Sequence, residues 1–189
     1  SIRIEPITGD RARREARVRY EMETREWVAR VQAEKRKTAS RGADQKAVLP
    51  PDWADKPLVP FARTYMTEIM PASAPQKGEV GTPLKLRMAR NEYETAAFGA
   101  YANGRDLADL TVRVSDLVAP GVGRLNGEVE LRAAEYSAVR AGENKYQLWP
   151  QRFWPAYPVD LEANRSHMFW LTVKTAGRAT RPGTYVGKI

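Results

Sequence analysis

Short segments of alternating apolar and polar residues constrain the fold of this 189-residue chain more than any other feature. Residues 84–88, 110–114, 129–133 and 169–173 alternate with the period of a strand that buries one face, and residues 94–101 suggest another strand. Asn-Gly and Pro-Gly pairs, which are typical of turns, separate these segments. The sequence therefore predicts an all-β fold: an antiparallel β-sandwich, jelly-roll or immunoglobulin-like, with an N-terminal helical extension.

The pattern predicts three regions. Residues 1–39 form a charged amphipathic extension, predicted to be helical over 10–38 with Thr8 or Asp10 as N-cap. Its apolar stripe holds Tyr20, Trp27 and neighbouring valines at spacings of three to four residues. Residues 40–59 are proline-rich and aperiodic, which predicts a linker. Residues 60–189 form the predicted sandwich domain, whose last strand is expected to be cut short at the C-terminus.

The charge of the chain is uneven along its length. The 31 basic and 23 acidic residues give a formal net charge of +8, and residues 10–37 contribute half of it. Glutamates interspersed among the arginines of that helix would repel phosphates, and acid–base pairs four residues apart favour a salt-bridged, solvated helix. We therefore expect no nucleic-acid partner. No apolar run reaches the length of a membrane span, so none is expected.

The composition restricts the chemistry that the chain could perform. Without cysteine and with only His167, the chain has no thiolate metal site and no site with two imidazoles, so we expect neither a metal nor a cofactor. Carboxylates remain, and Glu92 and Glu94 would lie on one face of a strand, about 7 Å apart. Such a separation suits the acid pair of a glycosidase. The alternative is that Glu92 satisfies backbone groups where a strand starts, and His167 is more typical of a surface or hydrogen-bonded position.

The densest group of aromatic residues lies between residues 146 and 157. Trp149, Phe153, Trp154 and Tyr157 stand among three prolines, which predicts an ordered irregular loop rather than a central strand. The rings could pack at the end of the sandwich or against a neighbouring domain. Alternatively, their flat faces could hold a carbohydrate. These four residues are the candidate contact site.

Several motifs, in order, resemble one family pattern. They are residues 89–94 (ARNEYE), 106–117 (DLADLTVRVSDL), 148–155 (LWPQRFWP), 169–173 (FWLTV) and 181–187 (RPGTYVG). Together they resemble the N-terminal β-sandwich domain of bacterial glycoside-hydrolase-like proteins, including glycoside hydrolase family 123. In that family the sandwich precedes a TIM-like barrel that carries the catalytic acids. The resemblance thus implies that no catalytic residue lies in this chain and that the protein is extracytoplasmic, either periplasmic or secreted.

Three functions follow as hypotheses. The first is a non-catalytic accessory domain that packs against a downstream catalytic barrel of the same polypeptide. The second is a carbohydrate-binding module that uses the aromatic residues as a platform. The third is a free-standing glycosidase that uses Glu92 and Glu94.

Overall fold

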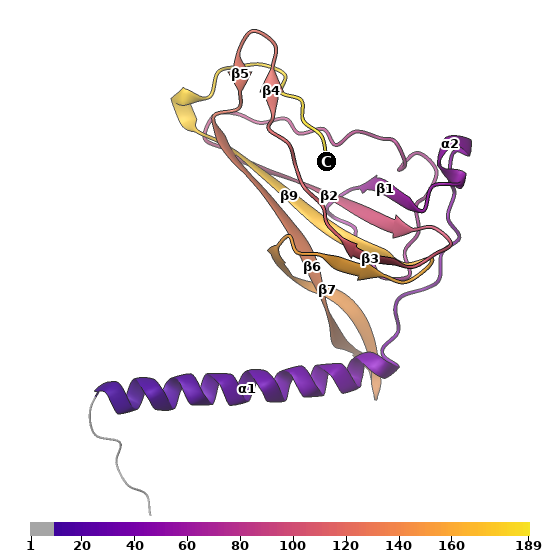
Figure 1. The fold of residues 1–189 in the computed structure, drawn as a ribbon, viewed down its shortest axis with the longest axis vertical. Helices are drawn as coiled ribbons and strands as arrows, with labels where there is room; N and C mark the ends of the chain where they lie inside the picture. The colour runs from indigo at the N-terminus through magenta and orange to yellow at the C-terminus, as the bar shows by residue number, and fades with distance from the viewer. Residues whose placement is uncertain (1–9) are drawn as a thin grey trace, which may run out of the picture.

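The computed structural model of the chain describes residues 10–189 and centres on a five-stranded antiparallel sheet (Figure 1). In spatial order, the strands are β1 (Leu58–Arg63), β2 (Tyr93–Ala102), β9 (Ser166–Thr175), β6 (Gly127–Gly142) and β7 (Lys145–Pro155). Two smaller sheets pair β3 (Leu107–Leu110) with β8 (Val159–Leu161) and β4 (Val118–Ala119) with β5 (Gly123–Arg124). The helices are α1 (Asp10–Thr38), α2 (Pro51–Ala54) and a 3-10 turn (Gly177–Ala179).

The predicted antiparallel all-β class with an N-terminal helix is confirmed. Thr8, one of the two predicted N-caps, lies outside the described residues. Among residues 10–189, no helix is both long and apolar enough to cross a membrane.

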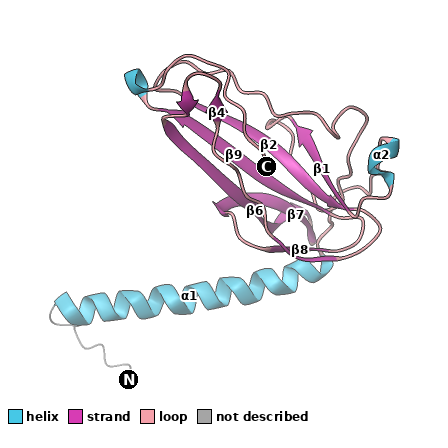
Figure 2. Ribbon diagram, turned by 45° about the horizontal axis from the view of Figure 1, so that its top comes forward, coloured by secondary structure: helices cyan, strands magenta, loops and turns pink. Residues whose placement is uncertain are grey.

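Both faces of the main sheet are covered, which gives two clusters of buried side chains. One cluster includes Val59, Phe61 and Met168, and residues 64–80 and 47–53 pack over it. The other includes Phe98 and Phe169, whose rings stack with centroids 5.4 Å apart, and is covered by β3, β8 and several extended loops. Figure 2 shows these loops alongside the strands. The second layer of the fold is therefore built from short sheets and loops.

The predicted strand at residues 84–88 is wrong in its hydrogen bonding but right in its burial pattern. The segment is irregular, yet Leu84, Leu86 and Met88 all pack against the second cluster. Similarly, β3 ends at Leu110, although Val112 beyond it also packs on that cluster. Alternation reports which side chains meet the core, whereas a strand also needs a neighbouring backbone to pair with.

The predicted aromatic loop at residues 146–157 is instead mostly strand β7. β7 forms the edge of the sheet. On the solvent side of an edge strand no neighbouring strand needs an N–H donor, so proline is tolerated there. Pro150 lies opposite Tyr136 beside an irregularity in the register, a position that also tolerates proline. The prolines therefore indicated an edge strand and not a loop.

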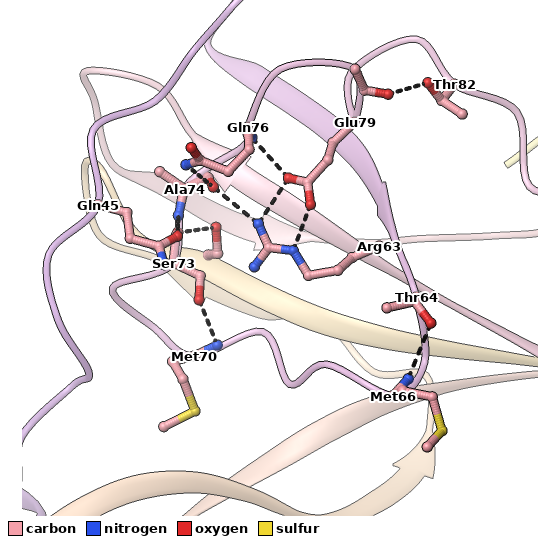
Figure 3. Close-up of polar contacts among 12 residues, drawn as sticks. Gln45, Arg63, Thr64, Met66, Met70, Ser73, Ala74, Gln76, Glu79 and Thr82 are labelled. Carbon is pink, nitrogen blue, oxygen red and sulfur yellow. Dashed lines mark hydrogen bonds and ion pairs between the residues drawn. The ribbon is translucent and has the colours of Figure 1, made fainter.

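A partly buried ion pair holds residues 64–80 on the sheet (Figure 3). Arg63 at the end of β1 forms a two-pronged contact with Glu79, with atom pairs 2.7 and 2.8 Å apart. Arg63 also donates to the Ala74 carbonyl, and Glu79 accepts from the Gln76 N–H. Although burial acts to raise the pKa of Glu79, these hydrogen bonds lower it overall.

The strand β6 has two halves with different neighbours. From Gly127 to Ala133 it pairs with β9, and beyond Ala133 it pairs with β7 alone. We call residues 134–153, which form the free part of the β6–β7 hairpin, the hairpin arm. In Figure 1 the arm reaches the C-terminal end of α1, while the rest of α1 projects away from the sheet.

Candidate functional site at the opening between two strands

The side chain of Tyr136 lies at the opening between β6 and β9. Its hydroxyl accepts a hydrogen bond from the Met168 N–H at 3.0 Å and donates to the Ile69 carbonyl at 2.6 Å. It thereby satisfies two backbone groups, one on β9 and one in the covering loop. Burial raises the pKa of Tyr136 well above its ordinary value, so the hydroxyl stays protonated and keeps both hydrogen bonds.

The C-terminal end of α1 covers the free edge of the hairpin arm. The Gln32 side-chain oxygen accepts from the Ala138 N–H at 2.9 Å, and Arg36 donates to the Tyr136 carbonyl at 2.5 Å. Next along the chain, Ser40 pairs with the outer edge of β7 at Gln147. Side chains of the helix thus replace the strand that β6 lacks here.

The structure separates the four predicted aromatic contact residues into two groups. Trp149 and Trp154 lie opposite Ser137 and Ala133 of β6, four residues apart, so the two indoles share one face of the sheet. Their exposed fractions are 37% and 49%, and Tyr157 beyond the strand is 38% exposed.

Phe153 lies on the other face, where its ring packs 5.1 Å from that of Trp170. The contact surface is therefore formed by Trp149, Trp154 and Tyr157, which we call the aromatic face.

A pocket of about 430 Å³ lies beside Tyr157 at the opening between β6 and β9. Residues from α1, β6, β8 and β9 and from the loops between them contribute to its wall. Six of the lining residues carry charge: Arg36, Arg41, Glu135, Asp160, Glu162 and Arg165. The pocket therefore gathers charged side chains at the place where the sheet opens.

Glu135 connects the pocket with the aromatic face. Its carboxylate accepts a hydrogen bond from the Trp154 indole N–H at 2.6 Å, and Arg36 lies 3.9 Å away. Burial raises the pKa of Tyr157, and the Glu135 carboxylate raises it further, while Arg36 acts in the opposite direction. The Trp154 ring is thus held in a fixed orientation beside the pocket.

Two ion pairs brace the rim of the pocket. Arg41 and Glu162 contact each other through two nitrogen–oxygen pairs, and the contact lowers the pKa of Glu162. Arg165 pairs with Asp44 at 2.7 Å. Asp160 accepts from the Asp109 backbone N–H.

His167 forms part of the pocket wall and is mostly buried. Its ring makes edge contacts with those of Tyr136 and Tyr157, at centroid distances of 5.3 and 6.5 Å. Burial lowers the pKa of His167 to about 4, against a hydrogen bond with the Ala134 backbone that acts to raise it. Among the described residues, the buried Nε2 atom of His167 has no hydrogen-bond partner.

Glu92 and Glu94 lie away from this pocket, at the start of β2. The Glu92 carboxylate accepts a hydrogen bond from the Ala89 N–H across the turn that precedes the strand. The Glu92 backbone pairs with Thr175 at the end of β9. Glu94 lies opposite Val173 in the ladder between β2 and β9. Among residues 10–189, no three histidine or carboxylate side chains are placed to hold a metal ion.

Sequence reasoning did not single out Glu135, Tyr136 or the charged rim. One signal for them was present: apolar residues alternate through Leu131 and Ala133, then change phase and continue through Ala134, Tyr136 and Ala138. The phase change coincides with the point where β6 leaves β9. The arginines and carboxylates of the rim come from segments far apart in sequence, and no local pattern joins them.

The comparisons with known proteins find similarity among solved structures. No protein-family model matches the chain, and no curated protein matches it. Among solved structures, a family 123 glycoside hydrolase from Clostridium perfringens, described for glycolipid glycan hydrolysis, matches 52% of this chain at 15% identity and a TM-score of 0.47. This chain spans 18% of that chain.

Proposed function

We propose that this chain is a non-catalytic accessory β-domain of a larger glycoside-hydrolase-like protein and that the aromatic face packs against its catalytic domain. The sequence motifs that resemble the N-terminal domain of such proteins support the class of the parent protein. The same resemblance supports an extracytoplasmic location, in the periplasm or outside the cell.

The aromatic face is the observation that carries this proposal. Trp149, Trp154 and Tyr157 are each more than a third exposed and gather along one edge of the sheet. Large rings grouped on a surface leave apolar area in water, and contiguous patches of this kind mark interaction sites. Tryptophan and tyrosine also dominate the energetically important centres of interfaces. A neighbouring domain would remove this area from water.

The proposal is tested first on the gene and then on the polypeptide it encodes. The reading frame beyond Ile189 should continue into a catalytic domain, and a stop codon directly after Ile189 would contradict the proposal. In the two-domain polypeptide, Trp149→Ala with Trp154→Ala should separate one thermal unfolding transition into two. Trp27→Ala on α1 is the matched control, since Trp27 is 59% exposed but distant in sequence from the aromatic face.

A second function, a carbohydrate-binding module, is favoured by the fixed orientation of Trp154. The hydrogen bond from its indole to Glu135 holds the ring before any ligand arrives, which lowers the entropic cost of binding. Retention on a polysaccharide affinity gel, lost in Trp154→Ala with the fold intact, would support this function. If instead the chain hydrolyses an aryl glycoside and Glu92→Gln abolishes the activity, the free-standing glycosidase hypothesis replaces both.

A further inference from the structure

The pocket at the opening between β6 and β9 has the size and the lining of a ligand site. Its volume of about 430 Å³ lies at the small end of the range for small-molecule pockets, roughly 300–1,000 Å³. The rings of Tyr157, Tyr136 and His167 form part of its wall, while charged groups converge from other sides. Polar groups that converge on a recess can orient a small ligand, and the aromatic rings add an apolar contact.

The balance of charges around the pocket indicates which class of ligand it could bind. Three arginines and three carboxylates line it, so their formal charges cancel while His167 is neutral. A balanced lining offers no net attraction to an anion or a cation. It does offer both kinds of hydrogen-bonding group, because arginine has only donors and an ionised carboxylate has only acceptors.

The existing ion pairs leave hydrogen-bonding capacity unused. A guanidinium has five N–H donors, and two nitrogens of Arg41 engage Glu162. A carboxylate has about four acceptor positions, and within the described residues Glu135 uses one for Trp154 and faces Arg36 with the other oxygen. A hydroxyl group both donates and accepts, so several hydroxyls on one small molecule match this lining.

We propose that this pocket binds a neutral, polyhydroxylated molecule of sugar type. Hydroxyl groups of the ligand would donate to Glu135 and Glu162 and accept from Arg36 and Arg41, while a C–H face of the ring packs on Tyr157. The site shares Tyr157 with the aromatic face, whereas Trp149 and Trp154 are not among its lining residues. It also differs from a flat aromatic platform, because the ligand would lie in an open recess with a charge-balanced lining.

The helix α1 is a structural part of this site. Its Arg36 supplies one wall, and the same side chain donates to the Tyr136 carbonyl on the hairpin arm. A ligand that contacts Arg36 would therefore hold the end of α1 more firmly against the arm. Amide exchange of residues 32–38 should slow when the ligand is bound, which provides a readout that does not depend on the aromatic residues.

The test uses the 189-residue chain and the indole N–H signals of its five tryptophans in nuclear magnetic resonance spectra. The signal of Trp154, assigned with Trp154→Phe, reports on the pocket through its contact with Glu135. The probes are the methyl glycosides of glucose, galactose and mannose, with inorganic phosphate and glucuronate as charged comparators. At least one neutral glycoside should shift this signal in a saturable way and slow exchange at residues 32–38.

Variants separate the pocket from the aromatic face. Glu135→Gln and Glu162→Gln should each weaken binding of the glycoside about tenfold, because a hydrogen bond to a charged group is lost. Glu128→Gln, on an exposed carboxylate outside the pocket, and Trp149→Ala should leave the affinity unchanged.

Three outcomes would overturn the proposal. The first is the absence of any saturable shift with the neutral glycosides. The second is that phosphate or glucuronate binds more tightly than every neutral probe. The third is that Trp149→Ala abolishes binding while both glutamine variants retain it, which would place the ligand on the aromatic face instead. Loss of interdomain packing would leave all of these measurements unaffected.

Discussion

The two halves of β6 satisfy the hydrogen bonds of their backbone groups in different ways. From Gly127 to Ala133, which we call the closed half, the backbone of β6 pairs with that of β9. Arg132 and Ala133 at the end of this half also pair with β7. In the hairpin arm, side chains take over on the open edge: Gln32 and Arg36 bind backbone groups of β6, and Tyr136 binds those of β9 and the covering loop. Leu131 and Ala133 of the closed half pack on the second cluster, and the open half adjoins a charged pocket.

This difference explains why the pocket lies where it does. A backbone ladder needs no particular side chain, so the closed half satisfies its backbone groups toward β9 without one. Where the ladder ends, polar side chains must enter the interior to satisfy the exposed backbone groups. Those side chains bring charge and titratable groups with them. The candidate site is thus a consequence of the sheet opening at Ala133.

The largest loss of stability is expected at the ion pair between β1 and the segment that covers it, from Glu79→Gln. This change leaves the Arg63 guanidinium, whose side chain is 9% exposed, without its charged partner. Breaking a buried ion pair from one side should lower the free energy of unfolding by about 3 kcal/mol. Chemical denaturation measures the loss. Glu128→Gln, which removes an exposed pair with Lys174, should change it by less than about 1 kcal/mol.

Tyr136→Phe tests whether a side-chain hydroxyl takes the place of backbone hydrogen bonds between strands in the open half. The variant keeps the ring but leaves the Met168 N–H and the Ile69 carbonyl without their partner. We expect the free energy of unfolding to fall by about 2 kcal/mol. Tyr185→Phe, which removes an exposed hydroxyl bonded to Arg181, is the matched control. Equal, small effects in both variants would show that the opening is satisfied in another way.

The pH dependence of stability tests the open half, because His167 lines the pocket beside it. Its pKa falls from 6.5 in the unfolded chain to about 4 in the folded state, so the unfolded state binds the proton first. The contribution of His167 is fully present above pH 6.5 and is lost as the pH falls towards 4. It should decrease by about 2 kcal/mol between pH 6.5 and pH 5.

His167→Phe should flatten this part of the stability curve while keeping the ring contacts with Tyr136 and Tyr157. Denaturation series at several pH values compare the variant with the unmodified chain. Tyr157→Phe retains the histidine and should keep the slope. A slope that persists in His167→Phe would assign the pH dependence to other groups.

The smallest effect is expected at the contact between α1 and the arm. Gln32→Ala removes the acceptor of the Ala138 N–H and should lower the free energy of unfolding by about 1 kcal/mol. Hydrogen exchange at Ala138 should accelerate in the same variant. Lys37→Ala, which removes an exposed ion pair with Glu34, should leave exchange at Ala138 unchanged. If both variants behave alike, the helix does not protect this edge.

The sequence allowed the β class, the helix α1 and most strands of the main sheet to be predicted, because alternation and turn residues are local signals. The strand β9 is an example: Phe169, Leu171 and Val173 alternate as predicted and are buried in the second cluster. Residues 84–88 show the limit, since alternation cannot say whether a partner strand is present. The edge position of β7 depends on the order of strands, which is a property of the whole fold.

The candidate site could be predicted only in part. Trp149, Trp154 and Tyr157 were found through their density, although Phe153 beside them faces the core. Arg41, Glu162 and Arg165 come together only when α1, β8 and β9 are placed, and the first two are 121 positions apart in the sequence. Long-range ion pairs of this kind have no spacing rule in sequence.

The cover that α1 provides has a consequence for self-association. An uncovered strand edge is a template on which the strand of another molecule can add, and native proteins block such edges. Here Gln32 and Arg36 occupy the open edge of β6, while Ser40 and Pro150 interrupt that of β7. A protease that cuts between α1 and Ser40 would release this block. The shortened chain would then be prone to polymerise through its hairpin arm. In the intact chain, the charged helix prevents this association by covering the strand edge.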